Sequence, residues 1–172
     1  LQAGRLSADR LRLETPAGAK PAAIIDVIAE IVDHFGVASD APVGVTIPGV
    51  VTHGVVRTAA NIDDSWIGTD IATELRDRLQ RKVYVVNDAD AAGYAELTNG
   101  AARGVRGRGL VATLGTGIGS ALIADGTLVP NTELGHLEID GHDAESRASA
   151  AAREREGKTW EEWVPRLQRY FE

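Results

Sequence analysis

The chain has 172 residues, of which 44% are hydrophobic and 25% are charged, a composition typical of globular domains. Its net charge of −7 argues against non-specific nucleic-acid binding, and the absence of cysteine excludes disulfides and cysteine-based zinc sites. Because no apolar run is long enough to span a membrane and no secretory signal pattern is present, we expect a cytoplasmic protein without membrane or nucleic-acid partners.

The first half of the chain alternates between predicted strands and helices. Residues 1–14 favour an extended, strand-like segment. The spacing of apolar residues predicts a helix over 21–36, a strand over 43–47 and a helix over 70–80. His53-Gly54 lies between two short valine-rich segments and predicts a hairpin turn. This alternation indicates an α/β architecture with mixed sheets.

The next segment also begins with a strand and a helix. Residues 83–86 form a short apolar strand, and a helix is predicted over 89–102. Two further strands, 110–114 and 121–124, flank a glycine-rich turn and predict a second hairpin. We expect a domain boundary near Asp88, where a strand is followed directly by a helix.

The C-terminal region is predicted to be helical. Residues 144–156 are rich in alanine and charged side chains, which favours a helix. Thr159 and Glu162 form a capping-box pattern at the start of a last helix. Pro165 is expected to kink that helix or to delay its start.

Two motifs indicate phosphoryl-transfer chemistry. Asn87-Asp88-Ala89-Asp90 follows an apolar strand, and Gly115-Thr116-Gly117 follows another. If these strand ends lie side by side, an acid/base group stands next to backbone N–H groups that can hold a phosphate. Glu133-Leu134-Gly135-His136 offers hydrogen-bonding side chains suited to a polyol. These features together favour a phosphotransferase that acts on a hydroxyl group.

Each of these motifs also has a plain structural interpretation. Asp88 could cap the following helix, and Asp90 could compensate the dipole of its first turn. The glycines could form an ordinary hairpin turn. The basic side chains before the glycine-rich strand could lie in a solvated loop, or they could bind a phosphate-rich donor. These side chains are Arg103, Arg106 and Arg108.

The motifs resemble those of the ROK family of sugar kinases and repressors. Segments 47–51, 57–68 and 133–141 are similar, more narrowly, to the polyphosphate-dependent glucokinases of actinobacteria. The resemblance implies a hexokinase/actin-like (ribonuclease H-like) fold of two α/β domains, with glucose in the cleft between them. Residues 1–87 would belong to the first domain and 88–172 to the second. The family's first phosphate loop and its adenosine-binding part would lie outside this sequence, so an internal fragment is expected.

The resemblance also implies roles for individual residues. Asp88 would take the proton from the 6-hydroxyl of glucose, with polyphosphate or ATP as the donor and Mg²⁺ accompanying that donor. The residues matching sugar-binding positions are Asn61, Asn87, Glu133, His136 and Glu145. For two of them a turn-forming role (Asn61) or a helix-terminal charge (Glu145) is a plain alternative. The residues assigned to the phosphoryl donor are Gly115, Thr116 and Gly117, with Arg103, Arg106 and Arg108 as a weaker candidate set.

This chain departs from the family's zinc-containing members. Those proteins use the histidine equivalent to His136 together with a downstream cysteine cluster, which this chain lacks, so we expect no zinc. A sugar-sensing transcriptional regulator of the same family is the competing interpretation, although no helix-turn-helix module is visible. A kinase for another hexose is a further alternative. The full-length protein is expected to be a homodimer.

Overall fold

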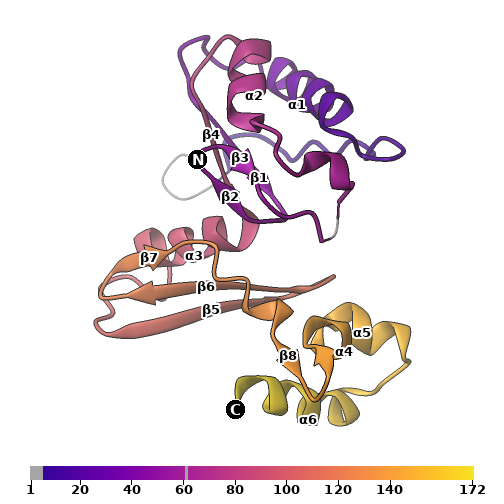
Figure 1. Cartoon of the computed structure of the whole chain (residues 1–172). Helices are drawn as coiled ribbons and strands as arrows, with labels where there is room; N and C mark the ends of the chain where they lie inside the picture. Colours follow the sequence, from indigo (N-terminus) through magenta and orange to yellow (C-terminus); the bar gives the residue numbers. More distant parts are fainter. Residues whose placement is uncertain (1–5, 61) are drawn as a thin grey trace. The chain divides into compact units, whose positions relative to one another are not determined.

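The structure, a computed structural model, describes residues 6–60 and 62–172. The pattern of residue contacts divides the chain into two compact units, which are described one at a time (Figure 1). The first unit contains residues 1–45 and 52–85, and the second contains residues 46–51 and 86–172. Of the helices that the structure describes, none is both long enough and apolar enough to cross a bilayer.

The first unit contains two helices that pack against each other, α1 (Pro21–Phe35) and α2 (Ile71–Leu79). Both were predicted from apolar spacing. Proline in the first turn begins α1, and Gly36, with a φ of 53°, ends it in the left-handed region that glycine tolerates. Asp70 caps α2 by accepting a hydrogen bond from the N–H of Thr73.

Short strands complete the first unit. β1 (Val43–Ile47) pairs with β4 (Val83–Asn87), and both strands run on into residues of the second unit. β2 (Val51–Thr52) pairs with β3 (Val55–Val56) through the predicted His53-Gly54 turn, where both residues have positive φ. A single-turn 3-10 helix, η1 (Asp64–Trp66), buries Trp66, whose indole N–H donates to the carbonyl of Ala19 at 2.8 Å.

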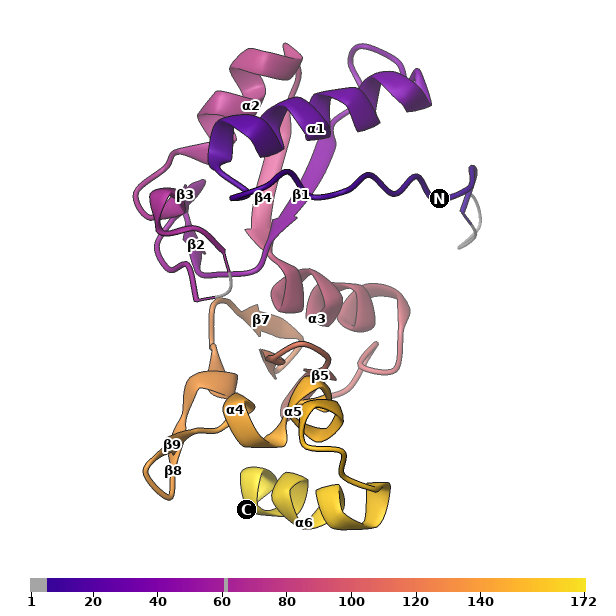
Figure 2. The same cartoon turned by 90° about the vertical axis from the view of Figure 1, so that its right-hand side faces the viewer.

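The second unit is built around an antiparallel sheet of three strands in the order β5 (Arg108–Leu114), β6 (Ile118–Ala124) and β7 (Thr127–Val129). The helix α3 (Asp88–Asn99) packs on this sheet, as the turned view shows (Figure 2). Its Gly93 allows the close approach, because a Cβ there would lie 2.3 Å from the Cβ of Ala121. The β5–β6 pair is the predicted hairpin, extended by several residues.

The chain then forms a series of short elements. A 3-10 turn, η2 (Leu134–His136), leads into a small hairpin of β8 (Glu138–Ile139) and β9 (His142–Asp143). Three helices follow, α4 (Glu145–Ala148), α5 (Ala150–Arg155) and α6 (Trp160–Phe171). The capping box at Thr159 and Glu162 is present as predicted.

The structure differs from three predictions about these elements. The helix expected over 144–156 is interrupted at Ser149, which has an extended backbone and whose hydroxyl caps a new helix by accepting from Ala152 N–H. Of the two alternatives for Pro165, the delayed start is wrong, because α6 begins at its capping box and contains the proline; the kink stays a prediction. No strand forms in the described part of residues 1–14.

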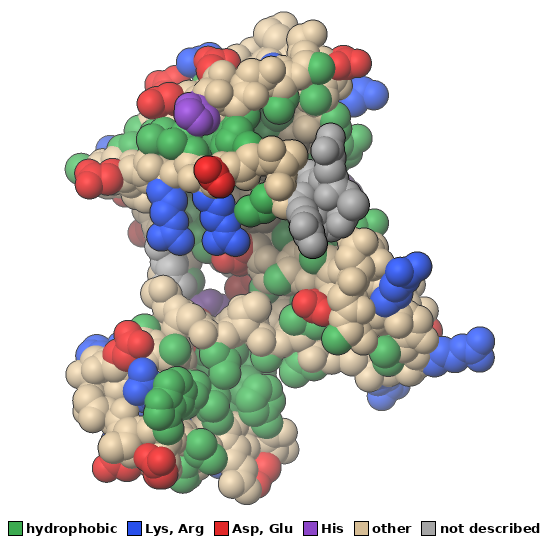
Figure 3. All heavy atoms as spheres, turned by 180° about the vertical axis from the view of Figure 1, so that it is seen from behind, with side chains coloured by type: hydrophobic (Ala, Val, Ile, Leu, Met, Phe, Trp, Pro, Cys, Tyr) green, Lys and Arg blue, Asp and Glu red, His purple; other side chains and the backbone are tan. Residues whose placement is uncertain are grey.

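The helix α6 buries one face only. Trp163 is 5% exposed, and its indole N–H donates to the carbonyl of Ala148 at 3.0 Å. Trp160 is 60% exposed and lies under the guanidinium of Arg153 at 4.2 Å. Hydrophobic side chains gather over this C-terminal helical region (Figure 3). The large exposed ones on α6 are Trp160, Val164 and Phe171.

Candidate active site

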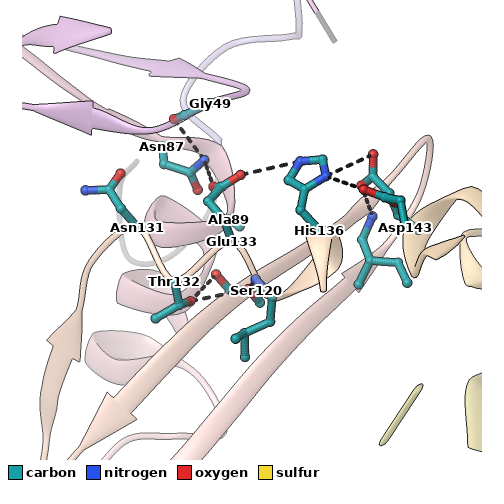
Figure 4. A network of polar contacts seen from close by, with 12 residues as sticks. Gly49, Asn87, Ala89, Ser120, Asn131, Thr132, Glu133, His136 and Asp143 are labelled. Carbon is teal, nitrogen blue, oxygen red and sulfur yellow. Dashed lines mark hydrogen bonds and ion pairs between the residues drawn. The ribbon is translucent and has the colours of Figure 1, made fainter. Parts of the chain in front are cut away.

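The junction of β4 and α3 is organised by the side chain of Asn87, which is buried at 3% exposure. Its Oδ1 accepts from the N–H of Asp90 at 3.0 Å, which makes Asn87 the N-cap of α3. Its Nδ2 donates to the Gly49 carbonyl at 3.1 Å and to Glu133 Oε1 at 3.0 Å (Figure 4). Both N–H donors of this amide are therefore used within the protein. Asn87 therefore orients the Glu133 carboxylate.

Asp88 is the first residue of α3, and its side chain is exposed. Its Oδ1 accepts from the N–H of Ala89 at 2.9 Å, and no other side-chain hydrogen bond of Asp88 is found among the described residues. Because Asn87 occupies the capping position, helix capping does not account for Asp88. One carboxylate oxygen thus remains available to an incoming hydroxyl group.

Asp90 serves a structural network. Its carboxyl is 4% exposed, and its Oδ2 accepts from the N–H of Asn131 at 2.8 Å. Burial raises the pKa of Asp90, and the neighbouring Asp88 raises it further, whereas the hydrogen bond from Asn131 lowers it. The Asn131 amide in turn exchanges two hydrogen bonds with the backbone of Val51. Asp90 thus has a buried bracing role, whereas its dipole role stays a prediction.

Glu133 and its neighbours are held against β6. Glu133 has a φ of 44°, in the left-handed region that only a few per cent of non-glycine residues adopt. The next N–H, of Leu134, donates to Ser120 Oγ at 2.8 Å, and Ser120 also contacts Thr132 (Figure 4). Gly135 lies so close to β6 that a Cβ would be 2.1 Å from the carbonyl oxygen of Ile118. The backbone of this motif is therefore fixed on the strand.

The Glu133 carboxyl belongs to a group of acids. Burial raises its pKa, His136 lowers it, and the carboxylates of Asp88, Asp90 and Glu145 raise it again. These electrostatic effects mean that Asp88, Asp90 and Glu145 lie near enough to repel the Glu133 carboxylate. Such a group holds hydroxyl-bearing ligands well, because each carboxylate offers several acceptor positions.

His136 lies among three carboxylates, those of Glu133, Asp143 and Glu145. Its Nδ1 is 3.0 Å from Asp143 Oδ2 and 3.9 Å from Glu145 Oε1, and its Nε2 is 3.8 Å from Glu133 Oε2 (Figure 4). The pKa of His136 is raised, chiefly by its hydrogen bond with Asp143, while burial acts in the opposite direction. The ring is therefore anchored on its Nδ1 side and open on its Nε2 side.

Glu145 connects this group to the glycine turn. Its Oε2 accepts from the N–H of Ile118 at 3.0 Å, immediately after the turn. A Cβ on Gly117 would lie 2.2 Å from that oxygen, so the carboxylate occupies the space that a side chain would need. Glu145 therefore braces the turn, and its sugar-binding role stays a prediction.

The glycine turn itself presents unused backbone donors. Gly115 N–H donates to the Gly117 carbonyl at 3.0 Å, and the Gly115 carbonyl accepts from Ala151 N–H at 3.0 Å. The backbone N–H groups of Thr116 and Gly117 have no hydrogen-bond acceptor within the described part of the chain. These two groups are suited to phosphoryl oxygens.

The base candidate and the turn lie in the same neighbourhood. Gly119, near the start of β6, is packed so closely on α3 that a Cβ there would be 2.9 Å from the Cβ of Ala89. Ala89 directly follows Asp88. The start of α3 therefore packs against β6 close to the glycine turn, although β4 and β5 belong to different sheets.

The arginine cluster lies elsewhere. Arg108 pairs with Ala124 at one end of the β5–β6 hairpin, whereas Leu114 pairs with Ile118 at the turn end. Six residues of strand separate these ends, a distance of about 20 Å. Arg108 is therefore at the end of the hairpin opposite the glycine turn. The donor contact of Arg103, Arg106 and Arg108 stays a prediction. Asn61, the remaining sugar-binding candidate, lies outside the described residues.

Asp143 was not among the predicted site residues. No pattern around the Gly141-His142-Asp143 segment indicates that its carboxylate returns to His136. Within the described residues, His136, Asp143 and Glu145 place one possible metal-ligand atom each within 4.8 Å of one another. The direct hydrogen bond between His136 and Asp143 accounts for this grouping without an ion.

Known proteins with similar sequences include sugar kinases. The sequence matches the ROK family over residues 3–155. It is 49% identical over 170 residues to the polyphosphate glucokinase of Mycobacterium tuberculosis, covering 98% of this chain and 63% of that protein. It is 34% identical over 125 residues to a glucokinase of Thermotoga maritima, covering 68% of this chain and 39% of that protein. The chain thus spans less than two thirds of the length of either relative.

Solved structures give the same assignment. The inorganic polyphosphate/ATP-glucomannokinase of Arthrobacter sp. strain KM superposes with a TM-score of 0.93 at 56% identity, covering 98% of this chain and 68% of that one. A ROK family glucokinase from Streptomyces griseus, in complex with glucose and AMPPNP, gives 0.71 at 29% identity, covering 82% and 49%. These matches show that the chain belongs to the ROK family and has the actin-like fold of its sugar kinases.

Proposed function

We propose that this protein transfers a phosphoryl group from polyphosphate or ATP to the 6-hydroxyl of glucose, giving glucose 6-phosphate. The observation that carries the proposal is the position of Asp88. Its carboxylate has an oxygen without a partner among the described residues, and the next residue packs against Gly119 beside the glycine turn. Phosphoryl transfer depends chiefly on alignment and charge stabilisation, so a free carboxylate oxygen close to unused backbone N–H groups supports the proposal.

In this proposal the residues divide the work as follows. Asp88 accepts the proton of the attacking hydroxyl. Glu133, His136 and Glu145 bind the other sugar hydroxyls, with Asn87 orienting Glu133 through its amide. The backbone of Gly115, Thr116 and Gly117 receives phosphoryl oxygens through the two unused N–H groups. Asn61 stays a predicted sugar contact.

Mg²⁺ would enter with the phosphoryl donor. This ion keeps much of its water shell and binds donor phosphates together with one or two protein carboxylates. Its contribution would be to neutralise charge on the transferred group. We expect no zinc, since the chain contains no cysteine.

The substrate assignment rests on the relatives. The mycobacterial relative is a polyphosphate glucokinase, and the Arthrobacter protein is a glucomannokinase, which supports glucose and keeps mannose as a rival substrate. A ROK family transcriptional regulator has a TM-score of 0.67 at 20% identity, so it shares the fold alone. The regulator function is therefore not favoured. A homodimer in the cytoplasm remains our expectation for the full-length protein.

The test compares the full-length protein with its Asp88→Asn variant. We expect glucose phosphorylation by polyphosphate, by ATP or by both in the wild type, and a loss of about a hundred- to ten-thousand-fold in kcat for the variant. Glucose binding, measured by calorimetry, should persist in the variant because the sugar-binding side chains are unchanged. The matched control is Asp77→Asn, at an exposed aspartate on α2.

Two results would oppose the proposal. If the wild type binds glucose but neither donor supports phosphorylation, a sugar-sensing regulator becomes the better assignment. If Asp88→Asn retains turnover similar to Asp77→Asn, then another group is the base. Parallel assays with mannose and N-acetylated hexosamines decide among the hexoses.

A further inference from the structure

Asp143 is fixed in place before it meets His136. The β8–β9 hairpin pairs Asp143 with Glu138, and the N–H of Ala144 donates to the Leu137 carbonyl at 2.8 Å. Asp143 Oδ1 accepts from Ser146 N–H at 3.2 Å, while its carbonyl accepts from the Ser146 hydroxyl at 2.6 Å. One carboxylate oxygen is thus held by the start of α4, and the other is directed at the imidazole.

The contact with His136 determines where the ring carries its proton. Asp143 Oδ2 lies 3.0 Å from His136 Nδ1. An ionised carboxylate only accepts hydrogen bonds, so Nδ1 must be the donor. In the neutral ring, Nε2 is then an acceptor, and in the charged ring it is a donor. In both states the unanchored Nε2 points toward Glu133.

The gap between Nε2 and Glu133 has the size of a ligand contact. Glu133 Oε2 is 3.8 Å from His136 Nε2, which is too long for a direct hydrogen bond. When the ring is charged, a hydroxyl at about 2.8 Å from each atom would bridge them, accepting from Nε2–H and donating to Glu133 Oε2. The other carboxylate oxygen of Glu133, Oε1, accepts a hydrogen bond from the Asn87 amide, which orients Oε2 toward this gap.

We propose that Asp143 is the positioning residue of the sugar site, fixing the ring of His136 so that its Nε2 and the Glu133 carboxylate together bind one hydroxyl of the hexose. This inference rests on the proposed function, since it takes a sugar as the ligand. Asp143 itself touches no substrate. It acts through His136, on which three carboxylates converge, those of Glu133, Asp143 and Glu145.

The electrostatics agree with this arrangement. The hydrogen bond from Asp143 is the largest cause of the raised pKa of His136, and Glu145 and Glu133 add to it. Removing the charge of Asp143 should therefore lower the pKa of His136. An amide at position 143 would also allow its N–H to donate to Nδ1, which favours the opposite tautomer of the ring.

The experiment uses Asp143→Asn in the full-length protein, with glucose as the probe. We expect the KM and the calorimetric Kd for glucose to rise about ten- to a hundred-fold, as for the loss of a hydrogen bond to a charged group. The KM for the phosphoryl donor should stay within about twofold, because the glycine turn is not altered. The ¹⁵N NMR titration of His136 should shift to lower pH.

Ser146→Ala serves as the structural control. It removes the hydroxyl that braces the Asp143 carbonyl and leaves the carboxylate on His136. If Asp143 only braces α4, Asp143→Asn and Ser146→Ala should lower the unfolding temperature alike and leave the titration of His136 unchanged. That result would overturn the inference. Asp143→Glu, which keeps the charge, should recover part of the glucose affinity.

Failure of this inference is separable from failure of the proposed function. A wild-type protein that phosphorylates glucose, with an Asp143→Asn variant of unchanged glucose KM and unchanged His136 titration, refutes the role of Asp143 alone. A wild-type protein that neither binds nor phosphorylates glucose refutes the proposed function.

Discussion

The two units of the chain bury different kinds of side chain. In the first unit the described core is apolar, with Val56, Ile71 and Leu75 fully buried. The second unit also buries apolar side chains, but every buried polar residue among the described ones belongs to it. These residues are Asn87, Asp90, Ser120 and Ser149.

This difference separates stability from positioning. Burying apolar surface stabilises a fold, whereas burying a polar group costs free energy unless it is hydrogen-bonded. In the second unit, three buried polar side chains make hydrogen bonds that hold residues of the candidate site or its surroundings in place. Asn87 orients Glu133, Ser120 holds the backbone of Leu134, and Asp90 anchors Asn131. We expect mutations in the two units to affect different properties.

The largest effect on stability should come from Leu75→Ala in the first unit. Leu75 is 0% exposed, and truncation of such a side chain leaves a cavity that costs about 2–5 kcal/mol. The folded fraction should keep its KM for glucose. Chemical denaturation of the full-length protein measures the change, with Ile67→Ala, at a 54% exposed side chain, as the control. A loss of glucose affinity in the folded enzyme would break the comparison between the units.

Gly117→Ala in the second unit should reduce activity strongly and stability only slightly. The new methyl group must displace the Glu145 carboxylate, which then loses its hydrogen bond to Ile118 N–H. We expect kcat/KM to fall about ten-fold or more, with the free energy of unfolding reduced by about 1 kcal/mol, the value of one hydrogen bond.

Steady-state kinetics with glucose and both donors tests this change. Gly109→Ala is the matched control in the same hairpin, because the nearest atom to its added Cβ would be 4.0 Å away. Equal activity of the two variants would show that Glu145 is not needed at the turn.

A smaller effect is expected from the pH dependence of stability. The pKa of Glu133 is raised above its ordinary value of 4.5, mainly by burial, so the folded state holds its proton more tightly than the unfolded state. As pH rises from 4.5 toward the raised pKa, the folded state binds more protons than the unfolded state, and its stability falls.

Glu133→Gln should therefore be less sensitive to pH in this window and at least as stable as the wild type at pH 7, while binding glucose more weakly. Urea denaturation at a series of pH values, combined with calorimetric glucose binding, checks both parts. A variant that is less stable at pH 7 and keeps its glucose affinity would contradict the role assigned to this carboxylate.

The smallest effect should follow from neutralising the arginine cluster. The cluster lies at or before the start of β5, and the strand separates it from the glycine turn by about 20 Å. The triple change of Arg103, Arg106 and Arg108 to Gln should therefore alter the KM for ATP less than about twofold. Assays with short and long polyphosphate show whether the cluster meets a long donor. A large increase in the KM for ATP would mean that the glycine turn is not the donor site.

Local chemistry made several elements predictable from the sequence. Proline and glycine delimit α1, and a capping box begins α6, since these signals act within a few residues. The strand-end motifs and the ROK resemblance were also recognisable, because the side chains required for that chemistry are adjacent in the sequence. The helix break at Ser149 was missed because alanine-rich propensity outweighs a single capping serine in such a prediction.

What the sequence by itself determined was therefore the order of the elements, the family and the motifs of the candidate site. Only the tertiary structure decided how the polar groups divide their roles. It assigned the helix cap to Asn87 and left Asp88 open, carried Arg108 away from the turn, and brought Asp143 to His136. The physical reason is that these contacts join residues through a hairpin or a strand register, and their geometry depends on the packed backbone.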